Sequence, residues 1–321
     1  MGKKALVTGG AGFIGSHVAD RLVAEGYAVT VLDNLSSGRR ENLPPAATFV
    51  EGDMTSPEAA ALVRAGTFDV MCHLAAQIDV RRSVLDPVYD AQRNIIGTLN
   101  LLEAIKASEY PTRVVFSSTG GALYGDFDPP PSTETNSKDP ESPYGIAKLS
   151  TEYYLAYYAR VHGLDTVALR YGNVYGPRQD PHGEAGVVAI FCKRLLAGSA
   201  LTVYGDGEQT RDYVYAGDVA SANFAAATRA LPAPGRLDAR AFNVGTAIET
   251  SVNTLVRTLQ KVSSATTAID YAPARAGELM RSALKTDKAR EVLGWTPQTS
   301  LEQGLANTYA FFRDLHTGSN A

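Results

Sequence analysis

Cysteine is nearly absent from this sequence of 321 residues, which contains only Cys72 and Cys192. Two cysteines cannot build a disulfide framework or a cysteine-based zinc cluster. Both lie in apolar runs, where we expect them to pack as small hydrophobic side chains. Basic residues are not in excess either, because 30 Lys and Arg stand against 34 Asp and Glu, a formal net charge of −4. This balance argues against a nucleic-acid-binding protein, which usually presents a basic face.

Long hydrophobic runs are also absent. None approaches the roughly 18 residues that a membrane-spanning helix needs. Apolar residues follow the first four residues directly and lead at once into a Gly-rich turn, which leaves no room for the apolar region of a signal peptide. We therefore expect a cytoplasmic protein without membrane contacts. The composition, 45% hydrophobic and 20% charged, is typical of globular proteins. At roughly 150 residues per domain, the length predicts two domains or one large α/β domain.

The first half of the chain alternates short apolar strands with helices. Strands are predicted at 5–8, 28–32, 49–51, 70–74, 114–118 and 166–170, and helices at 15–25, 56–64, 88–107 and 143–162. This alternation predicts an α/β protein with a Rossmann-type, doubly wound parallel sheet. Beyond residue 172 the pattern loosens, with short strands at 201–204 and 242–244 and helices at 187–197, 217–230, 251–262, 286–293 and 300–315. We predict a first domain over 1–171, to which parts of about 206–246 return, and a smaller, interleaved α/β domain over 172–321.

Three glycines, Gly9, Gly12 and Gly15, lie between the first predicted strand and the first predicted helix. The first allows a sharp turn, the second lets backbone N–H groups approach a pyrophosphate, and the third lets the helix pack close to the strand. The helix N-terminus adds free N–H donors and a partial positive charge. The loop therefore predicts a dinucleotide site in the first domain.

An acidic residue, Asp33, ends the second predicted strand. Its carboxylate can accept hydrogen bonds from the adenosine ribose and repel a 2′-phosphate, which predicts NAD rather than NADP. Arg39 and Arg40 could reach a 2′-phosphate, so NADP stays an alternative. Asp53, after the third strand, suits the adenine amino group, although an Asp that follows a glycine also forms turns.

Tyr144 and Lys148 lie four residues apart at the start of the helix predicted for 143–162, so they share one face. A neighbouring ammonium group lowers the pKa of a tyrosine towards neutrality, as a tyrosine general base requires. Ser118 or Thr119, at the end of the preceding strand, could orient the reacting oxygen. The alternatives are an exposed helix pair and hydroxyls that cap backbone groups.

Three motifs together resemble the extended short-chain dehydrogenase/reductases: TGGAGFIG at Thr8–Gly15, YGIAK at Tyr144–Lys148 and LRYGNVYGPR at Leu169–Arg178. Within this group the chain resembles, from Lys3 to about Phe312, the NAD-dependent nucleotide-sugar epimerases that invert C4 of UDP-glucose and UDP-galactose. The resemblance implies that Tyr144 takes the proton of the sugar 4-hydroxyl while hydride leaves C4 for NAD. Hydride then returns to the opposite face of a 4-keto sugar. The resemblance further implies a homodimer, formed by the predicted helices 88–107 and 143–162.

The resemblance also assigns residues to the cofactor. By the family's spacing Thr119 is preferred over Ser118 as the third catalytic hydroxyl, and Lys148 also holds the nicotinamide ribose. Asn94 buttresses the site. The remaining cofactor positions lie in the glycine loop, the adenosine loop and the strand ends: Phe13, Ile14, Asn34, Ser37, Gly38, Met54, Leu74, Ala75, Ala76 and Tyr171.

The second half supplies the positions that the resemblance assigns to the UDP-sugar. Guanidinium groups bind a diphosphate well, although each arginine could instead form a surface ion pair. A small residue at 282 leaves room for an N-acetyl group at C2 of the sugar. The positions are Thr119 and Val188 in the pocket, Asn173, Arg211 and Arg275 at the diphosphate, Tyr204 on the uracil, Glu278 on its ribose and Ser282 at C2.

Three other functions compete with this one. In related uronate 4-epimerases an arginine takes the place of Asp180 and a threonine that of Asn173, although Arg178 keeps a uronate substrate open. Related dehydratases carry an Asp-Glu pair after the catalytic hydroxyl, where this chain has two glycines. Non-catalytic NAD-binding regulators usually lose the Tyr or the Lys, and both are present. The sequence shows no metal-ligand set.

Overall fold

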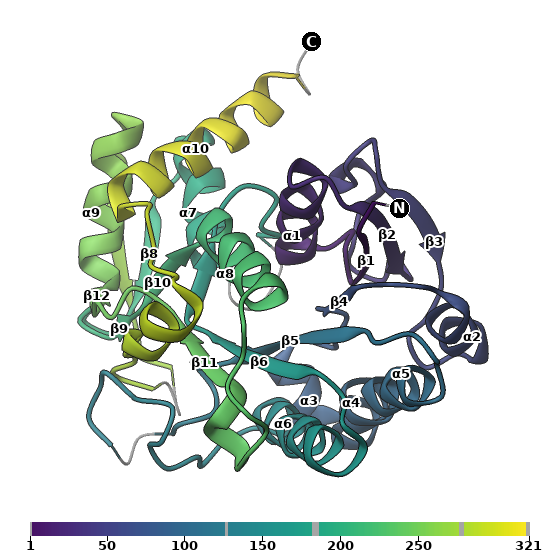
Figure 1. The fold of residues 1–321 in the computed structure, drawn as a ribbon. Coiled ribbons are helices and arrows are strands. Elements are labelled where there is room, and N and C mark those ends of the chain that lie inside the picture. The colour runs from purple at the N-terminus through teal and green to yellow at the C-terminus, as the bar shows by residue number, and fades with distance from the viewer. Residues whose placement is uncertain (1, 126–127, 182–185, 276–278, 319–321) are drawn as a thin grey trace.

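The computed structural model describes residues 2–125, 128–181, 186–275 and 279–318. Seven parallel strands form its central sheet, in the order β11-β6-β5-β4-β1-β2-β3 (Figure 1). They are β1 (Lys4–Thr8), β2 (Ala28–Asp33), β3 (Thr48–Glu51), β4 (Val70–His73), β5 (Arg113–Thr119), β6 (Thr166–Tyr171) and β11 (Ala241–Val244). The predicted parallel, doubly wound sheet is confirmed. The order turns back at β1 and β4, the place where such sheets bind ligands at their carboxyl edge.

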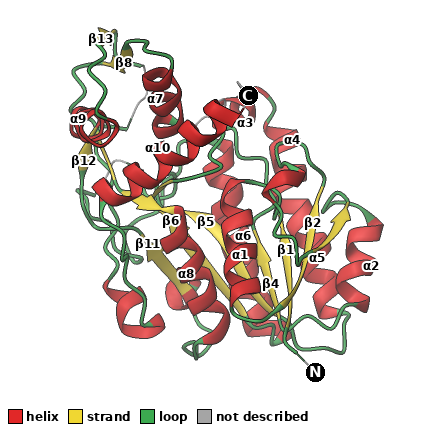
Figure 2. Cartoon of the chain, turned by 90° about the horizontal axis from the view of Figure 1, so that it is seen from above, coloured by secondary structure: helices red, strands yellow, loops and turns green. Residues whose placement is uncertain are grey.

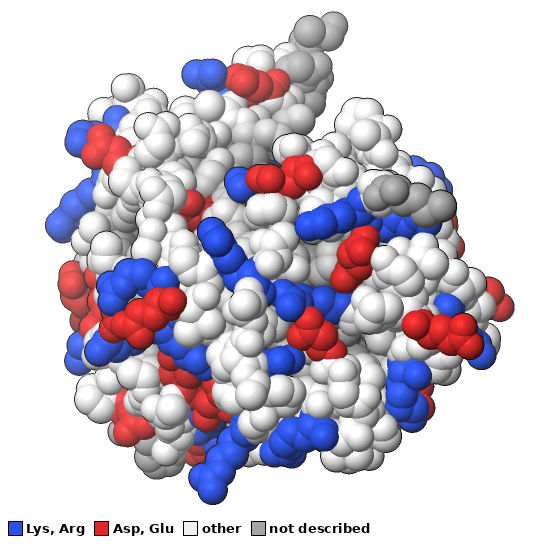
Figure 3. Space-filling model, viewed as in Figure 1, with Lys and Arg blue, Asp and Glu red and all other residues white. Residues whose placement is uncertain are grey.

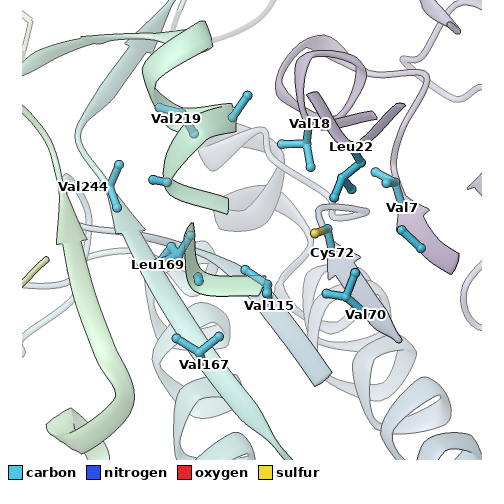
Figure 4. Close-up of a cluster of buried hydrophobic side chains, with 14 of the residues drawn as sticks. Val7, Val18, Leu22, Val70, Cys72, Val115, Val167, Leu169, Val219 and Val244 are labelled. Carbon is cyan, nitrogen blue, oxygen red and sulfur yellow. The ribbon is translucent and has the colours of Figure 1, made fainter. Parts of the chain in front are cut away.

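Helices cover both faces of this sheet (Figures 1 and 2). The helices α1 (Phe13–Ala24) and α8 (Ala216–Thr228) lie on one face, and α2 (Pro57–Ala65), α5 (Gly97–Lys106) and α6 (Pro143–His162) lie on the other. Neighbouring strand residues alternate between the two cores, because Val70 and Cys72 pack beneath α1 while Met71 packs beneath α5. Figure 4 shows Cys72 among Val7, Leu22 and Val70, and its burial raises the pKa of the thiol to about 12.

The second half builds a smaller lobe with its own core. Three helices, α7 (Val187–Leu196), α9 (Val252–Ser263) and α10 (Leu301–Gly318), enclose it beside the parallel pair β8 (Leu201–Tyr204) and β13 (Ile269–Ala272). Two further pairs join the lobes: β7 (Asn173–Tyr175) with β10 (Tyr213–Tyr215), and β9 (Thr210–Arg211) with β12 (Thr250–Ser251). The chain also returns to the large sheet, because β11 pairs with β6 and α8 packs beside α1.

The helix predicted for 88–107 is interrupted. It consists of α4 (Pro87–Ala91), a π-helical turn η2 (Gln92–Ile96) and α5. The π turn carries Asn94, whose side chain is 3% exposed and bonds to both backbone groups of Gln77. Sequence periodicity does not reveal the extra residue of such a turn. A second π turn, η4 (Ala289–Leu293), replaces most of the helix predicted for 286–293.

Several short elements escaped prediction. They are α3 (Val80–Leu85), the strand β13 and the single turns η1 (Arg40–Asn42) and η3 (Leu237–Arg240), besides the two-residue and three-residue strands. A helix of six residues shows too little periodicity to be recognised, although Asp79 caps α3 by accepting from the N–H of Arg82.

Charges of both signs are mixed over the face seen in Figure 3. Among the described residues, no helix is long and apolar enough to span a membrane. In the same part of the chain, no three His, Cys, Asp or Glu side chains lie close enough together to hold a metal ion.

Candidate active site

At two glycines of the loop, Gly9 and Gly15, an added side chain would collide with the backbone. Gly9 has a φ of +70°, and a Cβ atom there would lie 2.6 Å from the N atom of Ala75. A Cβ atom on Gly15 would collide with the carbonyl oxygen of Gly9. Gly12 caps α1 without a side-chain hydrogen bond, and the first turn holds no acidic residue. The backbone N–H groups of this turn therefore form a cradle suited to a pyrophosphate.

The end of β2 folds over this cradle. The carboxylate of Asp33, 7% exposed, accepts the N–H groups of Ala11 and Leu35, each at 2.9 Å. Gly38 lies against Ala11, and the N–H of Arg39 donates to the Ala11 carbonyl at 2.9 Å. The segment with the predicted residues Asn34 and Ser37 is thereby held beside the glycine loop. A carboxylate has about four acceptor sites, so Asp33 retains capacity for a ribose hydroxyl.

Asp53 is the acceptor centre of the next turn. It accepts the N–H and hydroxyl of Thr55 at 2.9 and 2.6 Å, the amide of Asn34 at 3.0 Å and the guanidinium of Arg93. Partial burial would raise the pKa of Asp53, but these hydrogen bonds and the Arg93 charge lower it to about 2. Asp53 therefore stabilises the turn after β3, which was the alternative to a contact with the adenine amino group. Met54 beside it is buried and packs against Gly97.

The remaining cofactor positions fall into two groups. Leu74, Ala75 and Ala76 follow β4. Leu74 and Ala75 lie against Gly9 of the glycine loop, and the N–H of Ala75 donates to Thr8 Oγ1 at 3.3 Å. The second group consists of residues whose side chains pack against other side chains of the protein: Phe13, Ile14 and Tyr171. Ile14 packs on the core beneath α1, and Phe13 meets the edge of the His17 ring. Tyr171 is buried, with its hydroxyl 2.8 Å from Asn223 Nδ2. The contacts of Tyr171 are those of a core residue.

Tyr144 and Lys148 stand together in the first two turns of α6. Lys148 Nζ lies 5.8 Å from the centroid of the Tyr144 ring and donates to the Ser117 carbonyl at 2.8 Å. The helix begins here because Ser142 caps it by accepting from the Gly145 N–H and Pro143 occupies its first position. The pair therefore lies at the carboxyl end of β5, beside the third predicted member of the site.

The electrostatics of this pair differ from the prediction. Burial, and then the charge of Asp90, raises the pKa of Tyr144 instead of lowering it. Burial lowers the pKa of Lys148 to about 8, although the carboxylates of Asp90 and Glu152 raise it. Asp90, 1% exposed, accepts from Gln77 and Asn94 at 3.0 Å each, and burial raises the pKa of its carboxyl. Burial thus favours the uncharged form of both side chains.

The two candidate hydroxyls have different surroundings. Ser118 is 3% exposed and its Oγ donates to Glu152 Oε1 at 2.5 Å, which directs it into the interior between β5 and α6. Thr119 is the last residue of β5 and is partly exposed. This difference favours Thr119 for contact with a substrate.

His73, as expected, is a core residue, since both ring nitrogens bond to the hydroxyls of Thr8 and Thr98 and burial lowers its pKa to about 3.

A segment of the small lobe lies directly on the end of β5. A Cβ atom on Gly120 would collide with the side chain of Leu284, and one on Gly121 would lie 3.6 Å from Asn173 Oδ1. Ser282, partly exposed, is two residues before Leu284. The structure thus brings Asn173 and the Ser282 segment to the strand end that carries Thr119.

The other substrate positions lie farther into the small lobe. Arg275 stacks on the ring of Tyr204, with Cζ 4.0 Å from the ring centroid. Arg211 is in β9 and donates to the carbonyl of Thr210 at 2.8 Å. Val188 is 1% exposed and packs in the core of the small lobe. Glu278 lies outside the described residues.

Comparison with known proteins decides the family. The profile of the NAD dependent epimerase/dehydratase family matches residues 5–245. The chain belongs to this family. The expected resemblance to nucleotide-sugar epimerases is therefore confirmed, and NAD is the cofactor of the family. The glycine cradle on β1 and the bare N-terminus of α1 fit that cofactor.

Three solved structures of related enzymes cover almost the whole chain. A UDP-glucose 4-epimerase of Thermotoga maritima with UDP-glucose is 47% identical, with a TM-score of 0.92 over 98% of this chain and 99% of that one. A Thermus thermophilus UDP-glucose 4-epimerase complex with NAD is 42% identical, with a TM-score of 0.88 over 97% and 99%. A UDP-N-acetylglucosamine 4-epimerase of Methanobrevibacter ruminantium, in complex with UDP-N-acetylmuramic acid, is 34% identical, with a TM-score of 0.90 over 98% and 99%.

Two residues of this epimerase-family site were not predicted. Asp212, 1% exposed, accepts the N–H and hydroxyl of Thr246 and the N–H of Leu284, and its carbonyl accepts the N–H of Asn173 at 2.7 Å. Nothing in the sequence indicated this junction of distant segments. Glu152 could have been found, because it continues the four-residue spacing of Tyr144 and Lys148.

We predict that Gly15→Ala weakens NAD binding by at least about tenfold, roughly 1.4 kcal/mol. The reason is that the added Cβ atom must displace the Gly9 carbonyl and with it the cradle. The measurement is a calorimetric titration with NAD after the bound cofactor has been removed. Gly2→Ala is the control, because a Cβ atom at Gly2 meets nothing within 4 Å. Equal affinity of the two variants would contradict the role of the cradle.

Proposed function

We propose that this protein is an NAD-dependent UDP-glucose 4-epimerase that interconverts UDP-glucose and UDP-galactose. The observation that carries the proposal is the position of Lys148, which lies beside the Tyr144 ring and donates to the Ser117 carbonyl, two residues before Thr119 at the carboxyl end of β5. The 47% identity to the Thermotoga enzyme, over nearly the full length of both chains, supports this substrate.

In this reaction Tyr144 removes the proton of the sugar 4-hydroxyl and later returns it. Bound NAD, held by the glycine cradle, would supply the acceptor and donor for the hydride of C4. Because the pKa of Lys148 is about 8, its side chain is an ammonium group at neutral pH and stabilises the Tyr144 phenolate. Thr119 donates a hydrogen bond to the reacting oxygen, since the Ser118 hydroxyl is bound to Glu152. The proton therefore moves between the substrate and Tyr144 Oη.

The small lobe binds the nucleotide. Arg211 and Arg275 would hold the diphosphate, with Asn173 beside it, and Tyr204 would stack on the uracil. The guanidinium of Arg275 already lies on the Tyr204 ring, so a base stacked on the other ring face would have a diphosphate partner next to it. The predicted contact of Glu278 with the uridine ribose stays part of this proposal.

We predict that Tyr144→Phe lowers kcat for UDP-galactose by about 10²–10⁴-fold, the usual contribution of general acid–base catalysis. NAD should still be bound, because the glycine cradle is untouched. The assay follows formation of UDP-glucose without added NAD, together with the NAD content of the purified protein. Activity equal to that of the wild type would refute the mechanism.

A second substrate class is favoured by the small side chain at 282. Ser282 is partly exposed and belongs to the segment that Leu284 fixes on Gly120, close to the reacting end of the pocket. The Methanobrevibacter relative is named as acting on UDP-N-acetylglucosamine. We propose that this protein also epimerises the N-acetylated sugars.

Ser282→Tyr is expected to lower turnover of UDP-N-acetylgalactosamine by about 100-fold and that of UDP-galactose by less than about threefold, because the added ring fills the space at C2. Both substrates are compared by kcat/KM. Ser282→Ala, which adds no bulk, should act on both sugars. Failure of the wild type to turn over the N-acetylated sugar would contradict dual specificity.

The alternative dehydratase reaction is disfavoured by packing as well as by sequence. It needs carboxylates directly after the catalytic hydroxyl. Any side chain at Gly120 would collide with Leu284. The uronate alternative is disfavoured because Asp180 would repel a substrate carboxylate. The presence of both Tyr144 and Lys148 disfavours a non-catalytic regulator.

We further propose a homodimer. Large apolar side chains are exposed in an apolar stripe along α3, α4, η2 and α6, elements that pack on one another. The stripe consists of Val84, Leu85, Val88, Ile96, Ile146, Tyr153, Tyr154, Tyr157 and Val161, each at least 40% exposed. A second copy can cover it across a two-fold axis, since stable interfaces bury about 800 Å² per partner.

The cytoplasmic location also stays a prediction.

Val88→Glu, on α4 within this stripe and 66% exposed, should convert the dimer to a monomer, because a carboxylate buried without a partner is costly. Light scattering after size-exclusion chromatography measures the mass. Ile248→Glu, 63% exposed in the other lobe, is the control and should remain dimeric. A monomeric wild type would contradict the proposal.

A further inference from the structure

An ionic network is buried beneath the proposed catalytic residues. Its centre is Arg170 in β6, the largest fully buried side chain of the described residues. The guanidinium bonds to both carboxylate oxygens of Glu152 at 2.6–3.1 Å and to Asp238 Oδ1 at 2.8 Å. Its third nitrogen donates to Tyr124 Oη at 3.0 Å and to the Glu134 carbonyl at 2.9 Å. Every donor group of Arg170 is therefore engaged, and Glu152 is held in one position.

Glu152 connects this network to both catalytic elements. It lies on α6 one turn beyond Lys148, as Lys148 lies one turn beyond Tyr144. Its Oε1 also accepts the hydroxyl of Ser118, the neighbour of Thr119, at 2.5 Å. One carboxylate of α6 thus fixes the end of β5, and with it the distance between Thr119 and the Tyr144–Lys148 face.

The network reaches the sugar side of the site as well. Tyr124 Oη donates to Asn243 Oδ1 at 2.7 Å, and Asn243 Nδ2 donates to the Ser132 carbonyl at 2.9 Å. Ser132 in turn exchanges backbone hydrogen bonds of 2.8 Å with Ala283 and Lys285, which flank Leu284. The segment that carries Ser282 and presses on Gly120 is therefore tied to the same buried group of side chains.

We propose that Glu152 is a positioning residue of the epimerase: it holds Thr119 against the catalytic face of α6 and places a fixed negative charge beside the Lys148 ammonium. This inference rests on the proposed function. Glu152 touches neither substrate nor cofactor in this arrangement. It acts through Ser118 and Lys148.

The titratable groups that face Lys148 are Tyr144 and Glu152 on α6, Asp90 on α4 and His73 on β4. Burial lowers the Lys148 pKa, and only the two carboxylates raise it. Three arginines of the packed elements are paired elsewhere: Arg82 with the Tyr89 ring, Arg93 with Asp53 and Arg113 with Asp165. Loss of the Glu152 charge would therefore lower the Lys148 pKa further, the more so because Arg170 would remain.

The test is the pH dependence of kcat for UDP-galactose in Glu152→Gln. The amide oxygen can still accept from Ser118, but the negative charge is lost. We expect the high-pH limb of the profile to move down by about one pH unit, because Lys148 loses its proton at lower pH. Asp238→Asn is the matched control, since it also removes a carboxylate from Arg170, but one that does not face Lys148. Its profile should coincide with that of the wild type.

A second variant tests positioning without breaking the ion pair. Ser118→Ala should lower kcat at least about tenfold with KM changed less than about twofold, and with the high-pH limb in place. An unshifted limb in an active Glu152→Gln variant, or an equal shift in Asp238→Asn, would overturn the electrostatic role. Unchanged kcat in Ser118→Ala would overturn the positioning role. If Glu152→Gln does not fold, the kcat of Ser118→Ala alone tests that role. A wild type that binds NAD but leaves UDP-galactose unchanged would instead refute the proposed function.

Discussion

The structure depends most on the buried ion pair between Arg170 of β6 and Glu152 of α6. Two charges withdrawn from water are stabilised only while each keeps its partners, and removing one partner typically costs about 3–5 kcal/mol. The pair therefore fixes α6 on the sheet more strictly than apolar packing alone, which tolerates sliding and repacking. Glu152 lies on α6 at the four-residue spacing of Tyr144 and Lys148, so the pair ties the helix that carries them to the sheet.

Local signals explain which parts of the molecule the sequence could predict. The bounds of α6 were predicted at both ends because Ser142 and Pro143 start it, and Gly163, at a φ of +71°, ends it. The parallel strands were predictable because burial on both faces makes them short apolar runs. The π turn at Asn94 and the helix α3 were not, since neither leaves a periodic pattern.

The residues of the candidate site also fall into two groups: those that local sequence patterns indicate and those that only the tertiary structure reveals. The positions of Gly9, Gly12, Tyr144 and Lys148 in the fold were predictable because each belongs to a short segment with its own sequence pattern. The contact of Leu284 with Gly120 and the junction at Asp212 join segments far apart in the sequence, so no spacing indicates them. Arg170 was unpredictable for another reason: a charged residue in a strand is usually exposed, and only the tertiary structure shows its burial.

The raised pKa of Tyr144 connects the charged groups around Tyr144 and Lys148 with the proposed chemistry. Burial favours the neutral form of both Tyr144 and Lys148, so the ammonium–phenolate pair is costly in the protein interior. The carboxylates of Asp90 and Glu152 offset that cost for Lys148, but the Asp90 charge increases it for Tyr144. Asp90 therefore favours the charged form of Lys148 and the neutral form of Tyr144. Glu152 favours the Lys148 ammonium without this opposing effect on Tyr144, and the ion pair with Arg170 fixes where that negative charge lies.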